Sequence, residues 1–240
     1  MTYRIGILFM VSIILLGGCQ ADKDETSMNP SEIDKEDLPD VHAFVDEFTR
    51  DFLQSTEETE EGFYPFLSKT KRYKMDFPGG GVIDDRAYFI KEKVHEEVHI
   101  SIEDDTGFGM DVIYYSGNTK DLLEEDLHAF KKRLGYDGDL KKLKKSDRSI
   151  YYAHFRDNGF DNYIGYVLNG KGDGGIELNL EIDCRDKKKK ACKENKQSNN
   201  ERAMKWMESV QFINENEGED REGRSHQLRQ RMAQLEYEDF

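Results

Sequence analysis

The segment His95-Glu96-Glu97-Val98-His99 places two histidines four residues apart, with a glutamate directly after the first. On a helix, the two imidazoles would lie one turn apart on one face and could bind one Zn²⁺ ion. Glu96 would then be placed to activate a metal-bound water. A third ligand would have to come from downstream, where the candidates are Glu124, Glu125 and His128. This arrangement would give the chemistry of a zinc-dependent metallopeptidase.

The same segment also fits a β-strand, and the strand is the interpretation that we favour. Val98, Ile100 and Ile102 alternate with polar residues, which is the period of a strand. In a strand, Glu96 would point away from both histidines, and the β-branched residues disfavour a long helix. We therefore expect a solvated strand face with no metal and no cofactor. The alternatives are an incidental surface metal site and the metallopeptidase, with His95, His99 and Glu124 as its ligands.

Cys19 is a further chemically distinctive residue. It ends Leu16-Gly17-Gly18-Cys19, which closes an apolar run from Ile5 that follows the single charge of Arg4. A run of about a dozen apolar residues is shorter than the roughly 20 that span a bilayer, and is typical of a signal segment. The tetrapeptide resembles the lipobox of bacterial lipoproteins, in which the cysteine is acylated and the preceding peptide is removed.

This resemblance implies that residues 1–18 are a signal peptide and that a lipid on Cys19 holds the chain at the cell membrane, facing outside the cytoplasm. The alternatives are an ordinary secretory signal, or a buried helix with a chance cysteine. Stable anchoring needs more than one acyl chain, and lipoproteins typically carry two or three.

The charge of the chain narrows the choice of partners. It has 35 Lys+Arg against 50 Asp+Glu, a net charge of −15 that becomes −16 when Arg4 is removed with the signal. An acidic surface repels phosphate backbones, so we expect no nucleic acid partner. Contact with the membrane must then come from the lipid, which leaves a protein or envelope component as the unknown partner.

Cys184 and Cys192 remain when Cys19 carries lipid, and they bracket seven residues. An even pair in an oxidising compartment predicts a disulfide. A metal pair or a reactive thiol is the alternative.

Composition divides the chain into three parts after the signal. Residues 19–39 are polar and acidic with few apolar residues, which predicts a disordered tether. Residues 40–213 can form one domain, and residues 214–240 are again polar, typical of a disordered tail or a frayed helix.

Three helices and several strands are predicted within the domain. The apolar spacing predicts helices over Val41–Leu53, over Lys120–Leu134 with Asn118 or Thr119 as its cap, and after the capping box Ser198-Asn199-Asn200-Glu201. Strand-like segments are Tyr73–Phe77, Val94–Ile102, Met110–Tyr115, Ser149–Phe155, Asn162–Leu168 and Gly175–Ile182. Hairpin turns are predicted at Arg156-Asp157-Asn158-Gly159 and at residues 169–174.

The order of these elements, with Phe77-Pro78-Gly79 after an opening strand and Ala203–Phe212 at the end, resembles the PsbP-like α/β/α sandwich family. The resemblance implies an α+β fold, a twisted antiparallel β-sheet flanked by helices, to which the Phe-rich helix over Val41–Leu53 is an N-terminal addition. It carries over no catalytic residues. We therefore expect a membrane-anchored exported lipoprotein that acts as a non-enzymatic binding or adaptor module.

Overall fold

A computed structural model describes residues 29–102, 108–185, 192 and 196–214. The signal peptide, residues 19–28 of the predicted tether with Cys19, and residues 215–240 lie outside the described residues. No helix in the described part of the chain is long and apolar enough to cross a membrane.

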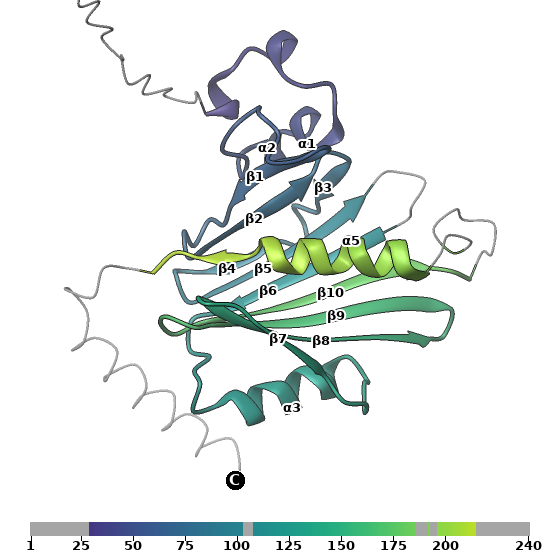
Figure 1. The fold of residues 1–240 in the computed structure, drawn as a ribbon. Helices are drawn as coiled ribbons and strands as arrows, with labels where there is room; N and C mark the ends of the chain where they lie inside the picture. The colour runs from purple at the N-terminus through teal and green to yellow at the C-terminus, as the bar shows by residue number, and fades with distance from the viewer. Residues whose placement is uncertain (1–28, 103–107, 186–191, 193–195, 215–240) are drawn as a thin grey trace, which may run out of the picture.

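A large antiparallel sheet forms the body of the fold (Figure 1), with its strands in the order β3-β5-β6-β10-β9-β8-β7 and with β4 paired to β5. Its strands are β3 (Gly81–Ile83), β4 (Phe89–Lys91), β5 (His95–Ile102), β6 (Phe108–Tyr115), β7 (Lys141–Lys144), β8 (Arg148–Asp157), β9 (Phe160–Asn169) and β10 (Gly175–Asp183). A second sheet has the order β1-β2-β11, with β1 (Phe63–Leu67), β2 (Tyr73–Pro78) and β11 (Gln211–Phe212). The predicted α+β class with an antiparallel sheet is confirmed.

The β8–β9 hairpin shows how local sequence fixes register. Asn158 and Gly159 both have positive φ, 46° and 86°. Two such residues in succession make the tight turn that matches the twist of flanking strands. Asp157 consequently pairs with Phe160, and the ladder continues to Arg148 opposite Asn169.

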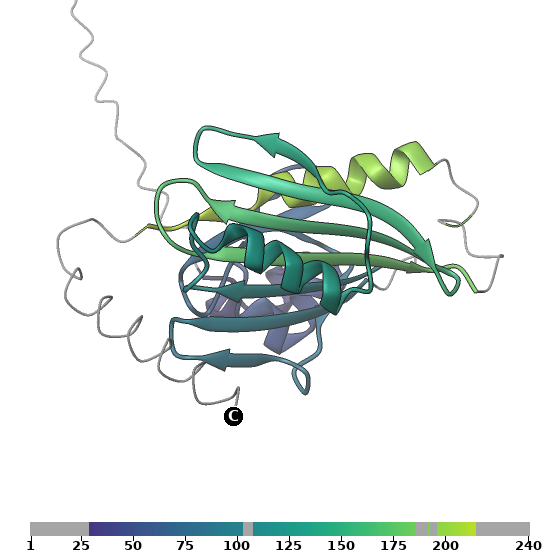
Figure 2. The same ribbon diagram turned by 90° about the horizontal axis from the view of Figure 1, so that it is seen from below.

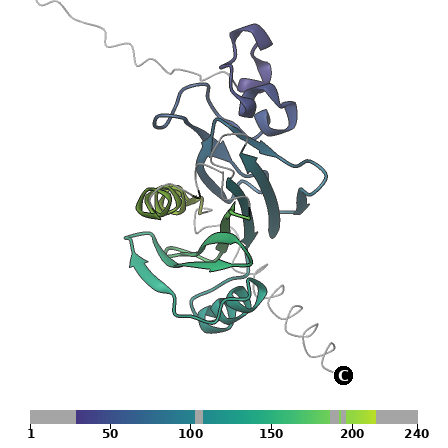
Figure 3. The same ribbon diagram turned by 90° about the vertical axis from the view of Figure 1, so that its right-hand side faces the viewer.

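The two faces of the large sheet are covered by different elements (Figures 2 and 3). Helix α5 (Lys196–Ser209) and the second sheet pack on one face, where both sheets share one hydrophobic cluster. Helix α3 (Leu123–Arg133) packs on the other face over a smaller cluster centred on Phe130. Gly165 lets α5 approach closely, because a Cβ there would lie 2.7 Å from the Met207 sulfur.

The predicted helix over Val41–Leu53 is wrong. The structure has two single turns instead, α1 (His42–Val45) and α2 (Glu47–Arg50). Asp46 between them is extended, and its carboxylate accepts a hydrogen bond from the Thr49 amide at 2.8 Å, so it caps a new turn. Val45, on the predicted apolar stripe, is 66% exposed as a result.

Two helix starts also differ from prediction. α3 begins at Leu123 with Leu122 at its N-cap, while Asn118 is buried and its side chain donates to the Tyr166 hydroxyl at 2.8 Å. α5 begins at Lys196, so the predicted capping residue Ser198 lies inside the helix. At α3, a tertiary contact uses the side chain of the predicted cap. At α5, the helix begins before the predicted cap.

Order begins before the predicted end of the tether at Pro39. Short 3-10 turns occupy η1 (Pro30–Glu32) and η2 (Lys35–Asp37). Pro30 is buried, and the Ser31 hydroxyl donates to Asp51 at 2.7 Å. Packing against the α2 region thus orders a segment whose composition alone predicts disorder.

Candidate functional site

The His95–His99 segment is strand β5, so the strand prediction is confirmed. His95, Glu97 and His99 lie on the face of the large sheet that also carries α3, and Glu96 points to the opposite face, which is the core. A helix that would place both histidines on one zinc ion is therefore not present at this segment.

Glu96 is fully buried and connects separate segments of the chain through hydrogen bonds. Its carboxylate accepts hydrogen bonds from the Lys69 amide (2.9 Å), the Thr70 amide (3.1 Å), the Thr70 hydroxyl (2.7 Å) and the Tyr88 hydroxyl (3.1 Å). Burial, followed by the nearby Glu96 carboxylate, raises the pKa of the Tyr88 hydroxyl. Glu96 thus connects the turn before β2 to β5. Its carboxylate lies on the opposite face of the sheet from His95 and His99, so it cannot activate a water bound between those histidines.

The two histidines bind separate carboxylates. The Nε2 atom of His95 lies 2.7 Å from Glu97, and the Nδ1 atom of His99 lies 2.7 Å from Asp111 on the neighbouring strand β6. Among the residues that the structure describes, no group of three or more His, Cys, Asp or Glu side chains could hold a metal ion. The alternative metal set of His95, His99 and Glu124 is therefore not assembled, and the metallopeptidase interpretation has no geometric support.

These side chains belong to a wider polar surface, which we call the open face: His95, Glu97 and His99 of β5, Asp111 of β6, and Glu177 and Glu181 of β10. α3 covers the β8 and β9 side of this sheet surface, where Phe130 packs with Ile164 and Tyr166. Figure 2 shows β5 beyond the edge of α3. His99 and Asp111 consequently keep about a third of their side-chain surface exposed.

Two carboxylates of the open face, Glu177 and Glu181, have a raised pKa. Burial, and then the charges of Asp111 and Asp183, raise the pKa of Glu181. Burial also raises the pKa of Glu177, although an ion pair with Arg133 of α3 opposes this shift. Carboxylates whose pKa is raised by burial and by neighbouring charges are common at functional sites.

A second cluster lies at the end of the β8–β9 hairpin. Buried Asp161 accepts hydrogen bonds from Arg156, whose Nε lies 3.0 Å away, and lies 3.2 Å from the His154 Nε2. Burial alone would raise the pKa of Asp161, but the hydrogen bonds from Arg156 and His154 hold it below its ordinary range. The His154 ring stacks on Tyr163 with centroids 4.4 Å apart.

The sequence alone leaves His154 isolated, because its partner comes from the next strand. The hairpin register would have indicated the meeting, since it places Arg156 opposite Asp161 and His154 opposite Tyr163.

Cys184 and Cys192 are joined by a disulfide, with Cα atoms 5.5 Å apart. The Cys184 sulfur lies 4.0 Å from the Asp161 carboxylate, so the crosslink abuts the hairpin cluster. Both cysteines pack against the main hydrophobic cluster. The disulfide links the end of β10 to the segment that precedes α5.

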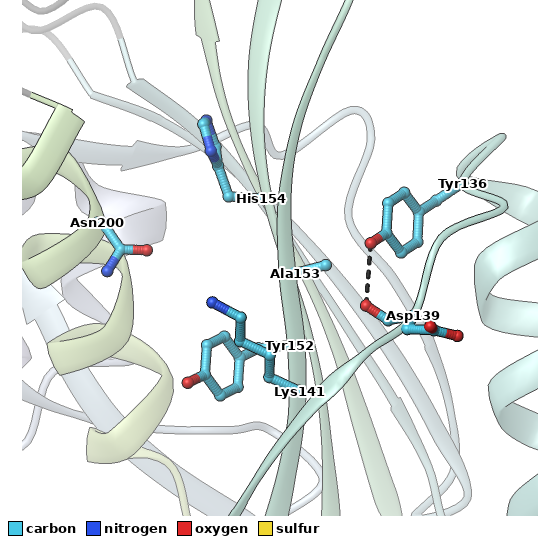
Figure 4. Close-up of a pocket in the computed structure, with 7 residues that line it drawn as sticks. All are labelled: Tyr136, Asp139, Lys141, Tyr152, Ala153, His154 and Asn200. Atoms are coloured by element: carbon cyan, nitrogen blue, oxygen red, sulfur yellow. Dashed lines mark hydrogen bonds between the residues drawn. The ribbon is translucent and has the colours of Figure 1, made fainter.

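A groove of about 410 Å³ follows the β8 edge of the sheet (Figure 4). Tyr136 and Asp139 line it on one side of β8, and Asn200 of α5 lies across from His154 on the other. The complete lining is Tyr136, Asp139, Lys141, Tyr152, Ala153, His154 and Asn200.

The fold and these surfaces define a small α+β protein with an open sheet face and, among its described residues, no assembled metal-binding group. Residues 39–211 match the family model described as "Putative lipoprotein YvcA". The chain belongs to this family. It is 30% identical over 236 residues to the "Putative lipoprotein YvcA" of Bacillus subtilis strain 168, an alignment that spans 87% of this chain and 96% of the relative.

Three solved structures show remoter similarity, each over 63% of this chain. The Ran-binding protein Mog1p of Saccharomyces cerevisiae is 10% identical with a TM-score of 0.42, and a point mutant of protein Mog1 is 7% identical with a TM-score of 0.43; 96% of each is covered. A protein of Bacteroides thetaiotaomicron is 14% identical with a TM-score of 0.39, and 48% of that chain is covered. The family that the comparisons show is the YvcA lipoprotein family, and they do not show the PsbP-like resemblance.

Proposed function

We propose that this chain is a lipid-anchored, non-enzymatic binding module on the outer side of the cell membrane, and that its open face binds a basic segment of a protein partner. Family membership supports the lipoprotein part of the proposal, with Cys19 as the acylated residue. The resemblance of Leu16–Cys19 to a lipobox supports the position of the anchor.

The observation that carries the binding role is the open face itself. Glu97, Asp111 and Glu181 place carboxylates along a diagonal across β5, β6 and β10, where α3 does not cover the sheet. Burial and mutual repulsion disfavour the charge on Glu181, and the positive charge of a docked Lys or Arg side chain would favour it. Complementary charge also speeds association and selects against acidic partners.

The test compares two variants that each remove two negative charges. Asp111→Asn/Glu181→Gln neutralises the open face, whereas Glu124→Gln/Glu125→Gln neutralises exposed positions on α3. Tagged full-length proteins are crosslinked and purified from native membranes, and each captured protein is then assayed for direct binding to the purified chain.

We expect a captured protein with a Lys- or Arg-rich segment that binds wild type and the α3 variant equally. Its Kd should rise at least about tenfold for the open-face variant, equivalent to about 1.4 kcal/mol. Equal affinity for all three proteins would contradict the proposal.

A further inference from the structure

The outer edge of β8 is only half covered. β7 pairs with Ser149–Tyr152, whereas β8 continues to Asp157. Within the described ranges, no strand pairs with Ala153–Asp157 on this side of β8. A strand edge without a partner presents free main-chain donors and acceptors, which can pair with another chain.

The ladder shows which groups are free. The Lys145 amide donates to the Arg148 carbonyl at 2.9 Å, so the backbone of Arg148 points toward β7. In an antiparallel strand every second residue points the same way, which brings the series to His154 and Arg156. Their backbone N–H and C=O groups therefore face outward, beyond the last residue that β7 covers.

The groove along β8 occupies the place where the ladder would continue. β7 begins at Lys141, opposite Tyr152, and the preceding chain turns away at Asp139, whose carbonyl accepts a hydrogen bond from the Tyr136 hydroxyl at 3.0 Å. Figure 4 shows Tyr136 and Asp139 set apart from β8 on one side of this space. The gap next to Ala153 and His154 therefore lies where a further strand would continue the ladder.

The two sides of this edge differ in chemistry. On the α3 side, Ala153 is buried and Phe155 is partly buried, and the Tyr136 ring stacks on Phe155 with centroids 5.0 Å apart. On the α5 side, His154 and Arg156 are joined by Lys141, which shares the face of its pairing partner Tyr152. One side is apolar and aromatic, and the other carries basic side chains, of which His154 and Arg156 also contact the Asp161 carboxylate.

We propose that the β8 edge binds an extended segment of a partner protein by strand addition. Acidic side chains of that segment face Lys141, His154 and Arg156, and alternate apolar side chains face Ala153, Phe155 and Tyr136. Main-chain hydrogen bonds to His154 and Arg156 supply affinity, and the alternating side chains supply selectivity. This site is separate from the open face and selects the opposite charge, so it goes beyond the proposed function.

The experiment uses the chain from Gln20 to Phe240 with its disulfide formed, and a capped peptide Ser-Leu-Glu-Leu-Glu-Leu-Ser as the probe. Amide hydrogen exchange is followed by NMR. In the free protein, the amides of His154 and Arg156 should exchange about 100-fold faster than those of Ala153 and Phe155, which point toward β9. The peptide should slow exchange at His154 and Arg156 at least about tenfold and leave Ala153 and Phe155 unchanged.

Two controls make the result specific. A peptide with the order Ser-Leu-Leu-Glu-Glu-Leu-Ser has the same composition without alternation, and it should bind at least about tenfold more weakly. Lys141→Glu should weaken binding of the alternating peptide at least about fivefold, whereas Lys142→Glu, which reverses the same charge on the other side of β7 above Tyr151, should change it less than about twofold.

Protection at other residues, or none at His154 and Arg156, would overturn the proposal. Slow exchange at these amides in the free chain would overturn it too. If exchange then becomes fast in a chain ending at Asn214, the occupant is the chain's own residues 215–240. If protection instead rises with protein concentration, the occupant is a second copy.

Discussion

Single residues in this protein take their roles from the face of the strand on which they lie. Glu96 and Glu97 are neighbours in sequence, yet Glu96 accepts four hydrogen bonds in the core and Glu97 pairs with His95 at the surface. A motif that predicts a catalytic glutamate therefore contains a structural one, because the pleat sends adjacent side chains to opposite faces.

Replacing Glu96 by Gln should destabilise the fold. The amide nitrogen cannot accept hydrogen bonds, so buried donors of Lys69 or Thr70 lose their acceptor. We expect the free energy of unfolding to fall by about 2–4 kcal/mol in urea titrations. The matched change Glu97→Gln removes a partly exposed partner of His95 and should cost less than about 1 kcal/mol. Equal losses, or stoichiometric zinc in the purified protein, would show that Glu96 has another role.

Asp161 is a second residue whose charge stabilises the fold. Asp161→Asn should lower the free energy of unfolding by about 1–3 kcal/mol at pH 7, because Arg156 and His154 lose a buried charged acceptor. The pKa of Asp161 is lower in the folded protein than its ordinary value of about 3.9. Its stabilisation is thus complete above about pH 4 and is lost as the pH falls through the folded pKa.

The check for Asp161 is urea unfolding at pH 7 and in acid. Wild type and Asp161→Asn should differ at pH 7 and converge in acid. Asp157→Asn, at the exposed end of the same hairpin, should stay within about 0.5 kcal/mol of wild type. A difference that persists unchanged in acid would mean that the carboxylate charge is not the cause.

At the scale of elements, the large sheet is held between two separate hydrophobic layers. α5 and the second sheet share the main cluster, and α3 has its own cluster around Phe130. The narrow cover of α3 leaves the open face, and the short β7 leaves the edge of β8. The open face exists because α3 is narrower than the sheet, and the free edge exists because β7 is shorter than β8.

The Cys184–Cys192 disulfide is the covalent link between two of these elements. It closes a short ring, whose loop-closure entropy is worth about 2–3 kcal/mol. Cys184→Ser/Cys192→Ser should therefore lower the free energy of unfolding by this amount without preventing folding. Non-reduced peptide mapping of protein exported by its native cell should find the two cysteines joined, and two free thiols there would refute the pairing.

At the scale of the whole molecule, the chain is strongly acidic but its surfaces differ in sign. The net charge is −15, and the open face follows it with Glu97, Asp111 and Glu181. The edge of β8 opposes it with Lys141, His154 and Arg156. If both proposals hold, two partners of opposite charge bind at different surfaces of a protein that, as we propose, a lipid on Cys19 holds at the membrane.

Cys19→Ala should release the protein from the membrane, because acyl chains on Cys19 are the anchor that we propose. The measurement is the distribution of full-length protein between membrane and soluble fractions of its native cell. Most of the wild type should sediment with membranes, and most of the variant should not. Cys184→Ser/Cys192→Ser also removes cysteines and should fractionate like wild type. A Cys19→Ala protein that still sediments fully would place the anchor elsewhere.

Several features could be predicted from the sequence because their causes are local. The alternation from Val98 to Ile102 predicted strand β5, the apolar spacing predicted α3, and Asn158-Gly159 predicted the turn of the β8–β9 hairpin. The lipobox-like segment pointed to a lipoprotein, and family membership agrees with it. In each case neighbouring residues carry the signal.

Other features depended on contacts between distant parts of the chain. Strand β1 contains Pro65 and β7 is nearly all lysine, so neither has a strand pattern of its own; each forms because a neighbouring strand supplies its hydrogen bonds. The capping of Asp46, the burial of Glu96 and the meeting of His154 with Asp161 likewise need partners that only packing brings close. The sequence determined the periodicity of the helices and strands, and its lipobox-like segment pointed to a compartment. The tertiary structure decided which faces of the sheet stay open, because that depends on how far each covering element extends over its neighbours.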